Sequence, residues 1–103
     1  MSDALVHCGS VVEEEVQLSL VGLCHACHAS SEQVVALVDE GVLEPAGRVP
    51  DEWQFGGAAL RRARAALRLG HDLQLNAAGV ALALDLLDEI EALRSRLRRA
   101  GRT

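Results

Sequence analysis

The sequence contains very few aromatic residues and no lysine. Among its 103 residues are one Trp, one Phe and no Tyr, and all ten basic residues are Arg. We attribute the preference for Arg to genome composition rather than to function. No apolar run is long enough to cross a bilayer, because the longest, residues 77–87, is interrupted by Asp85. Half of the residues are nevertheless apolar, so the chain can bury the one modest core of a small domain.

Targeting signals are also lacking. The first residues include Asp3 and carry no positive side chain ahead of an apolar segment, so no signal peptide is predicted. The three cysteines are an odd number, which in a chain without an export signal favours reduced thiols over a disulfide framework. The sequence therefore predicts a cytoplasmic protein without a membrane partner.

The net charge of −5 is unevenly distributed. Residues 1–52 carry ten acidic residues and only Arg48, a balance of −9, whereas residues 53–103 carry nine Arg and five acidic residues, a balance of +4. An acidic first half argues against a nucleic-acid surface there and favours a basic protein partner. The alternative is an acidic face that is simply solvated.

Two short helices are predicted near the start of the regular structure. Ser19 is suited to cap a helix over residues 20–27. Ser30 and Gln33 have the spacing of a capping box, which opens a second helix that Gly41 is suited to end in the left-handed conformation. Two short helices joined by a tight turn indicate a helix-turn-helix.

The segment after the second helix is expected to form a small β-hairpin, or wing. Residues 44–57 hold both prolines and three of the glycines. Trp53 and Phe55 alternate across Gln54 and would face the same side of a strand. A further short strand is predicted over residues 13–18.

The rest of the chain is expected to be helical. A third helix is predicted over residues 58–69, and Asn76 is suited to cap a fourth that continues to residue 99. The predicted fold is therefore mainly α, a winged helix-turn-helix with a C-terminal helical extension. Its parts are a flexible N-terminus over 1–12, the helix-turn-helix with wing over 13–57, and a helical pair over 58–103 that ends in a coiled-coil-like helix.

The fourth helix carries a short apolar seam whose members are four, three and four residues apart. This spacing is typical of a coiled coil and predicts a homodimer. The seam consists of Leu86, Ile90, Leu93 and Leu97.

DNA binding is not predicted. A recognition helix needs cations for phosphates and Arg, Asn or Gln for base edges, but residues 31–40 carry three carboxylates and no cation. In the wing, Arg48 is offset by Asp51 and Glu52. Carboxylates facing a polyanion weaken association, so we expect no nucleic-acid partner.

The same acidic residues are candidates for a protein-binding surface. Trp53, if it is exposed on the wing, would be the anchor of that surface; the alternative is that Trp53 and Phe55 pin the wing to the core. The predicted partner-binding residues are Glu32, Val35, Ala36, Asp39, Glu40, Asp51, Glu52 and Trp53.

A cluster of cysteine and histidine residues occupies positions 24–28. Its Cys-x-x-Cys-His pattern matches the haem c attachment signature, but the chain has no export signal and no Met besides Met1, so we interpret the match as chance. Zinc is the sharper alternative, because Cys24, Cys27 and His28 share one helical face, with His7 or Cys8 as further ligands. Small core cysteines are favoured over a zinc site, and no cofactor is predicted.

No enzyme is predicted. A Cys–His pair can act as nucleophile and base, but no third orienting group is evident. The Gly56-Gly57 pair is an isolated turn rather than a phosphate-binding loop. We therefore expect no catalytic residues.

Residues 19–45 resemble the MerR family of winged-helix regulators. The matching elements are Ser19-Leu20, Ala29-Ser30 and Gly41-Val42-Leu43-Glu44-Pro45. Val35-Ala36-Leu37 stands where that family has an Arg-Tyr-Tyr-like triplet facing DNA.

A closer resemblance, over roughly residues 14–97, is to the CbpM-type chaperone modulators. It rests on the block Asp72–Leu84, on Ser30-Ser31-Glu32 and on Trp53-Gln54-Phe55. This resemblance implies that the chain binds the J-domain of the DnaJ-like co-chaperone CbpA and inhibits its stimulation of the Hsp70 chaperone DnaK. The Cys/His cluster and the early end of the last helix depart from the family. The alternatives are a MerR-like DNA-binding transcriptional regulator and a zinc-binding regulatory module.

Overall fold

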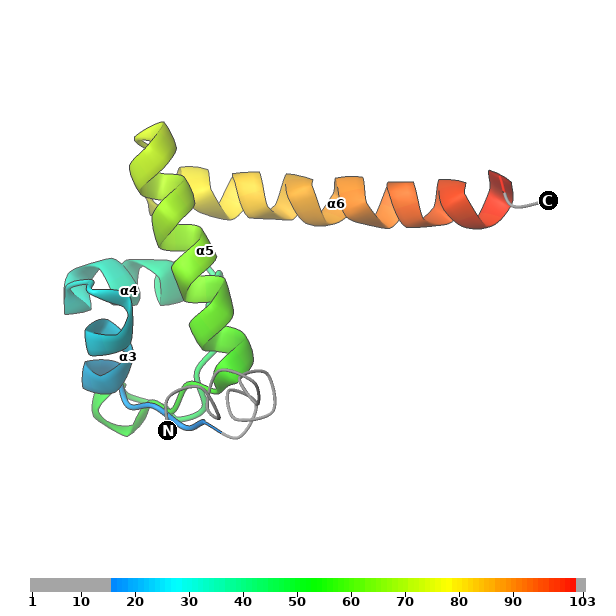
Figure 1. The fold of residues 1–103 in the computed structure, drawn as a ribbon. Coiled ribbons are helices and arrows are strands. Elements are labelled where there is room, and N and C mark those ends of the chain that lie inside the picture. The colour runs from blue at the N-terminus through cyan, green and yellow to red at the C-terminus, as the bar shows by residue number, and fades with distance from the viewer. Residues whose placement is uncertain (1–15, 102–103) are drawn as a thin grey trace, which may run out of the picture.

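The protein is a small helical body from which one long helix projects (Figure 1). The computed structural model describes residues 16–101. In that part of the chain the elements are α3 (Leu20–Cys27), α4 (Ser31–Asp39), the 3₁₀ turn η1 (Pro50–Glu52), α5 (Gly57–Leu73) and α6 (Ala77–Gly101). The prediction of a mainly α fold is confirmed. The predicted flexible N-terminus over 1–12 lies outside the described residues.

The two predicted short helices, α3 and α4, are confirmed together with their caps. The Gly22 N–H donates to Ser19 Oγ at 3.1 Å, which starts α3. At α4 the capping box is complete: the Gln33 N–H donates to Ser30 Oγ at 3.1 Å, and the Ser30 N–H donates to Gln33 Oε1 at 2.9 Å. Between the helices His28 adopts a left-handed conformation, with φ 54°, and reverses the chain.

The exit from α4 is held by backbone geometry and by α5. Gly41 has φ +80°, as predicted, and stops the helix without steric cost. Val42 and Leu43 then turn into the core, and their N–H groups donate to the Leu37 carbonyl at 2.9 and 3.4 Å. The α4 helix is thus fixed at both ends, which gives its outer face a defined position.

The predicted hairpin wing is not confirmed. Of the strand predicted over 13–18, residues 13–15 lie outside the described residues, and no strand forms over 16–18. In the described residues only two isolated antiparallel bridges form, Leu18 with Phe55 and Ala46 with Gln54. Between Ala46 and Gln54 the chain bends into η1 instead of running extended, because Pro50 lacks an N–H and its fixed φ favours a tight turn. Gly47 has φ +114°, and a Cβ there would meet the Glu52 carbonyl oxygen at 2.7 Å.

Helices α5 and α6 are longer than predicted and pack closely where they meet. α5 extends to Leu73 rather than to residue 69, and Gln74 ends it in the left-handed region with φ 56°. A Cβ on Gly70 would lie 3.2 Å from Val80 Cγ2, so glycine permits the close approach of α6. The predicted cap of α6 is confirmed, since the Gly79 N–H donates to Asn76 Oδ1 at 2.8 Å.

Only the first two turns of α6 belong to the core. Val80 and Leu84 are buried, whereas every residue from Asp85 to Gly101 is exposed except the half-buried Ser95. At 1.5 Å per residue this leaves about 25 Å of helix outside the body. In the described residues no helix is both long enough and apolar enough to span a membrane.

Candidate functional site

The outer face of α4 is acidic. Val34 and Leu37 are buried, which turns Glu32, Asp39 and Glu40 to solvent. Val35 and Ala36 are half-buried beside them. α4 itself contains no Lys or Arg that could neutralise a phosphate. The cation beside its end is Arg62 of α5, which shares a cavity with Glu40 and donates to the Val42 carbonyl.

The acidic residues of the wing segment form a separate group. Asp51 and Glu52 are exposed in η1. In Figure 1 the green loop that contains η1 lies below α3, whereas α4 lies above it. The structure therefore does not bring Asp51 and Glu52 onto the surface formed by α4.

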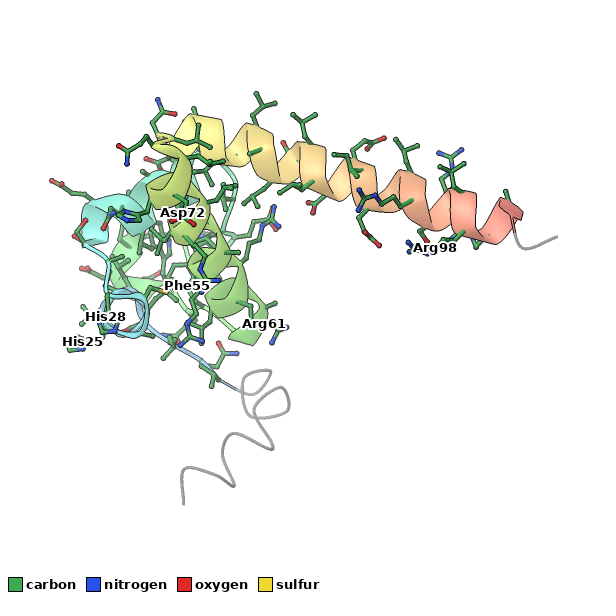
Figure 2. All side chains as sticks on the ribbon, turned by 45° about the horizontal axis from the view of Figure 1, so that its top comes forward. His25, His28, Phe55, Arg61, Asp72 and Arg98 are labelled. Atoms are coloured by element: carbon green, nitrogen blue, oxygen red, sulfur yellow. The ribbon has the colours of Figure 1, made fainter. Side chains whose placement is uncertain are left out.

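Trp53 does not have the exposure that a binding anchor needs. Its side chain is only 8% exposed, and its ring meets that of Phe55 edge to face, with centroids 6.0 Å apart and planes at 84°. Phe55 is fully buried in the interior of the body (Figure 2). The alternative in which both rings pin this segment to the core is the one that the structure adopts.

The Cys/His cluster does not assemble into a metal site. Cys24 and Cys27 are half-buried and pack against the core, while His25 and His28 are exposed at the outer edge of α3 (Figure 2). Within residues 16–101 no three His, Cys, Asp or Glu side chains are placed to hold a metal ion. His7 and Cys8, named above as further zinc ligands, lie outside the described residues.

The chemistry of the two thiols agrees with a packing role. Burial raises the pKa of Cys24, and the backbone hydrogen bond partly opposes this. Burial also raises the pKa of Cys27, where the nearby Arg64 lowers it and Cys24 raises it further. A thiol with a raised pKa is mostly protonated at neutral pH, which makes it a poor nucleophile and metal ligand.

Sequence reasoning missed a pocket between α4, α5 and α6. Its volume is about 300 Å³. The lining comes from segments far apart in the chain, so no local pattern reveals it. The sequence signal that could have indicated the pocket is the presence of small residues on all three helices, namely Ala36, Ala66, Gly70 and Ala77. The lining residues are Gln33, Ala36, Leu37, Ala66, Leu67, Gly70, His71, Leu75, Asn76, Ala77 and Val80.

The comparisons with known proteins agree with this arrangement of helices. The family described as MerR HTH family regulatory protein matches residues 18–101. The chain is 39% identical over 90 residues to the chaperone modulatory protein CbpM of Coxiella burnetii, covering 87% of this chain and 85% of that protein. It is 45% identical over 80 residues to the protein of the same name in Pseudomonas putida, covering 78% and 79%. The chain belongs to the CbpM family.

Membership of the CbpM family narrows the class of function. The relatives are named as modulatory proteins of chaperones and the wider family as regulatory proteins, and neither description is of an enzyme. The protein is thus a chaperone modulator built on a MerR-type helix-turn-helix. The triplet Val35-Ala36-Leu37 lies on α4, with Leu37 in the core and the other two residues half-buried.

In this CbpM-family protein the apolar seam of α6 is exposed. Its four members lie on a different face from Val80 and Leu84, which hold α6 to the body. The side chains are between 44% and 70% exposed: Leu86, Ile90, Leu93 and Leu97. The seam therefore has no covering partner within the described part of the chain.

Proposed function

We propose that this CbpM-family protein binds the J-domain of a DnaJ-like co-chaperone of the CbpA type and thereby inhibits the stimulation of the Hsp70 chaperone DnaK. The observation that carries the proposal is the outer face of α4, where three carboxylates surround two half-buried apolar side chains and α4 itself supplies no cation. J-domains are expected, by the family resemblance, to present a basic helix to Hsp70. An acidic surface with an apolar centre is the complement of such a helix.

The proposed mechanism is competition for one surface of the J-domain. Opposite charge on α4 speeds encounter and orients the two proteins, and the apolar centre then supplies the contact that is desolvated. A J-domain helix that lies against α4 is unavailable to Hsp70. Inhibition then requires no chemical step and no cofactor.

The experiment is a pair of charge reversals, one on each acidic group. We expect Glu32→Arg/Asp39→Arg/Glu40→Arg to weaken binding to the isolated J-domain by about tenfold or more, measured by calorimetry at low salt. The matched control, Asp51→Arg/Glu52→Arg, reverses charge in the separate η1 loop, and we expect its affinity to stay within about twofold. The inhibition of J-domain-stimulated ATP hydrolysis by DnaK is measured in parallel and should follow the affinity.

Two results would count against the proposal. If the α4 variant folds and binds as tightly as the wild type, α4 is not the binding face. If the wild-type protein does not bind the J-domain at all, the function itself is wrong, and the alternatives of DNA or zinc binding are tested next by a duplex-DNA titration and by metal analysis.

We also propose that α6 pairs with α6 of a second copy in the antiparallel sense. The seam has a symmetric spacing, so antiparallel pairing sets Leu86 against Leu97 and Ile90 against Leu93 of the other copy. The charges of α6 also favour antiparallel pairing. Residues 85–91, nearer the body, include four acidic residues, and residues 94–99, farther from it, include four Arg. Antiparallel pairing places the acidic half of each helix beside the Arg half of the other.

A further inference from the structure

We propose that the pocket between α4, α5 and α6 receives a single apolar side chain from a basic helix of the partner. This inference rests on the proposed function, and it names the part of the surface that supplies the anchoring contact. The pocket meets the acidic face at Ala36, which belongs to both.

The first argument is the composition of the pocket. Its lining includes the apolar side chains Leu37, Leu67, Leu75 and Val80 together with several small residues. Two of its three polar residues are engaged in helix caps, because Gln33 Oε1 accepts from the Ser30 N–H and Asn76 Oδ1 accepts from the Gly79 N–H. The third, His71, is exposed to solvent. A site for a small polar ligand needs converging polar groups. This pocket instead favours an apolar side chain.

The second argument is the charge along the rim. Glu32 and Glu40 lie four residues before and after Ala36, so they flank the pocket along the exposed face of α4. An apolar side chain carried on a helix with Lys or Arg one turn to either side would place both cations beside these carboxylates. Charge complementarity thus selects a basic amphipathic helix over an acidic or neutral one.

The third argument is that the pocket is preformed. Three helices supply its walls, and the α5–α6 junction is packed so closely that a Cβ on Gly70 would lie 3.2 Å from Val80 Cγ2. A rigid pocket loses little conformational entropy when an anchoring side chain enters it. The contact of that one side chain can therefore supply most of the binding free energy.

A row of apolar side chains runs along α6 from Val80, which lines the pocket, to the exposed surface. Val80, Ala83 and Leu87 are three and four residues apart and share one side of the helix. Ala83 is half-buried and Leu87 is 51% exposed, and neither belongs to the seam proposed for pairing. A partner helix seated in the pocket has further apolar surface to cover in this direction.

The test fills the pocket from α4. We expect Ala36→Phe to weaken J-domain binding by about tenfold or more, because the new ring occupies the space of the anchor. The matched control is Ala65→Phe, an exposed position on α5 that is not part of the pocket, and it should bind within about twofold of the wild type. If Ala36→Phe fails to fold, Ala77→Phe fills the same pocket from α6.

Methyl signals in solution give a second readout. Addition of the J-domain should shift the Val80 and Leu75 signals of the wild type, while the Val49 signals, in the loop before η1, stay in place. The same signals are followed on dilution of Ile90→Asp protein, in which pairing along the seam is blocked. Shifts there would assign the pocket to a second copy and overturn the inference.

The two proposals fail differently. Full affinity in a folded Ala36→Phe protein overturns the pocket but leaves J-domain binding intact. Absence of binding by the wild type overturns both.

Discussion

Arg62 Nε donates a hydrogen bond of 2.9 Å to the backbone carbonyl of Val42, and this contact ties α5 to the exit of α4. The two residues are twenty positions apart in the chain. Val42 is buried directly after the turn at Gly41, and the hydrogen bond to its carbonyl is partly buried. The contact holds the acidic helix against the body.

Loss of this hydrogen bond should destabilise the fold. We expect Arg62→Ala to lower the free energy of unfolding by about 1–2 kcal/mol, since it leaves a partly buried carbonyl without its donor. Urea denaturation followed by circular dichroism gives the measurement. Arg62 also lies 3.7 Å from Asp88, but both side chains of that ion pair are more than a third exposed. Asp88→Ala should therefore cost less than about 0.5 kcal/mol, and a larger cost would mean that the ion pair dominates.

Two glycines with positive φ should respond differently to alanine. Gly41→Ala adds a Cβ in open space, so only the left-handed backbone conformation is unfavourable, and the free energy of unfolding should fall by about 1–2 kcal/mol. Gly47→Ala adds a Cβ that would meet the Glu52 carbonyl oxygen at 2.7 Å, so backbone must move as well. We expect the midpoint of thermal unfolding to fall further for Gly47→Ala. Equal losses at both sites would contradict the tight turn described for residues 47–52.

The seam of α6 should control the oligomeric state. We expect the wild type to sediment as a dimer and both Ile90→Asp and Leu93→Asp to sediment as monomers, because each places a carboxylate in an apolar interface. Ala92→Asp, on an exposed position outside the seam, is the control and should remain dimeric. A wild type whose mass is that of a monomer at every concentration would rule out the pairing.

The direction of pairing has its own test. Mixing Leu86→Cys protein with Leu97→Cys protein should give a cross-linked heterodimer under mild oxidation, whereas each variant alone should give little. The reverse pattern would indicate parallel helices. The wild-type protein, oxidised in the same way, measures any cross-linking that comes from the native cysteines.

The half-buried thiols of Cys24 and Cys27 should weaken the fold at high pH. Burial raises the pKa of Cys24 and Cys27 above the ordinary value of 9.0, so the unfolded chain loses these protons at lower pH than the native protein. The stability that the neutral thiols contribute is complete below pH 9 and is lost as the pH rises through the raised pKa values. We expect the free energy of unfolding to fall above pH 9, and to fall less steeply in Cys24→Ala/Cys27→Ala. An identical slope in the variant would contradict this origin.

Local signals predicted the helices well. Ser19, Ser30 and Asn76 each cap the helix they were expected to cap, and Gly41 ends α4 as its freedom at positive φ suggests. These interactions span three or four residues, so a sequence pattern contains all of their partners. The wing was not confirmed, because pairing between strands depends on residues farther apart in the sequence. Alternation around Trp53 predicted a strand, but the turn at Pro50 and the burial of both rings left only isolated bridges.

The candidate site was predicted only in part. The acidic face of α4 follows from helical periodicity, since the burial of Val34 and Leu37 fixes which residues face outward. The separation of Asp51 and Glu52 from α4, and the pocket itself, depend on how helices distant in the sequence pack together. The CbpM-family resemblance identified the family but contained no information about these contacts.

Helix α6 links the pocket to the seam within one rigid element. Its first residues, Ala77 and Val80, line the pocket, and the exposed part beyond Leu84 carries the apolar seam. Two chains joined along the seam would hold their pockets at a fixed spacing, facing a partner as a bivalent receptor. A co-chaperone that is itself paired would then engage the second pocket intramolecularly, and its apparent affinity would be set by effective concentration as much as by the contacts of either pocket.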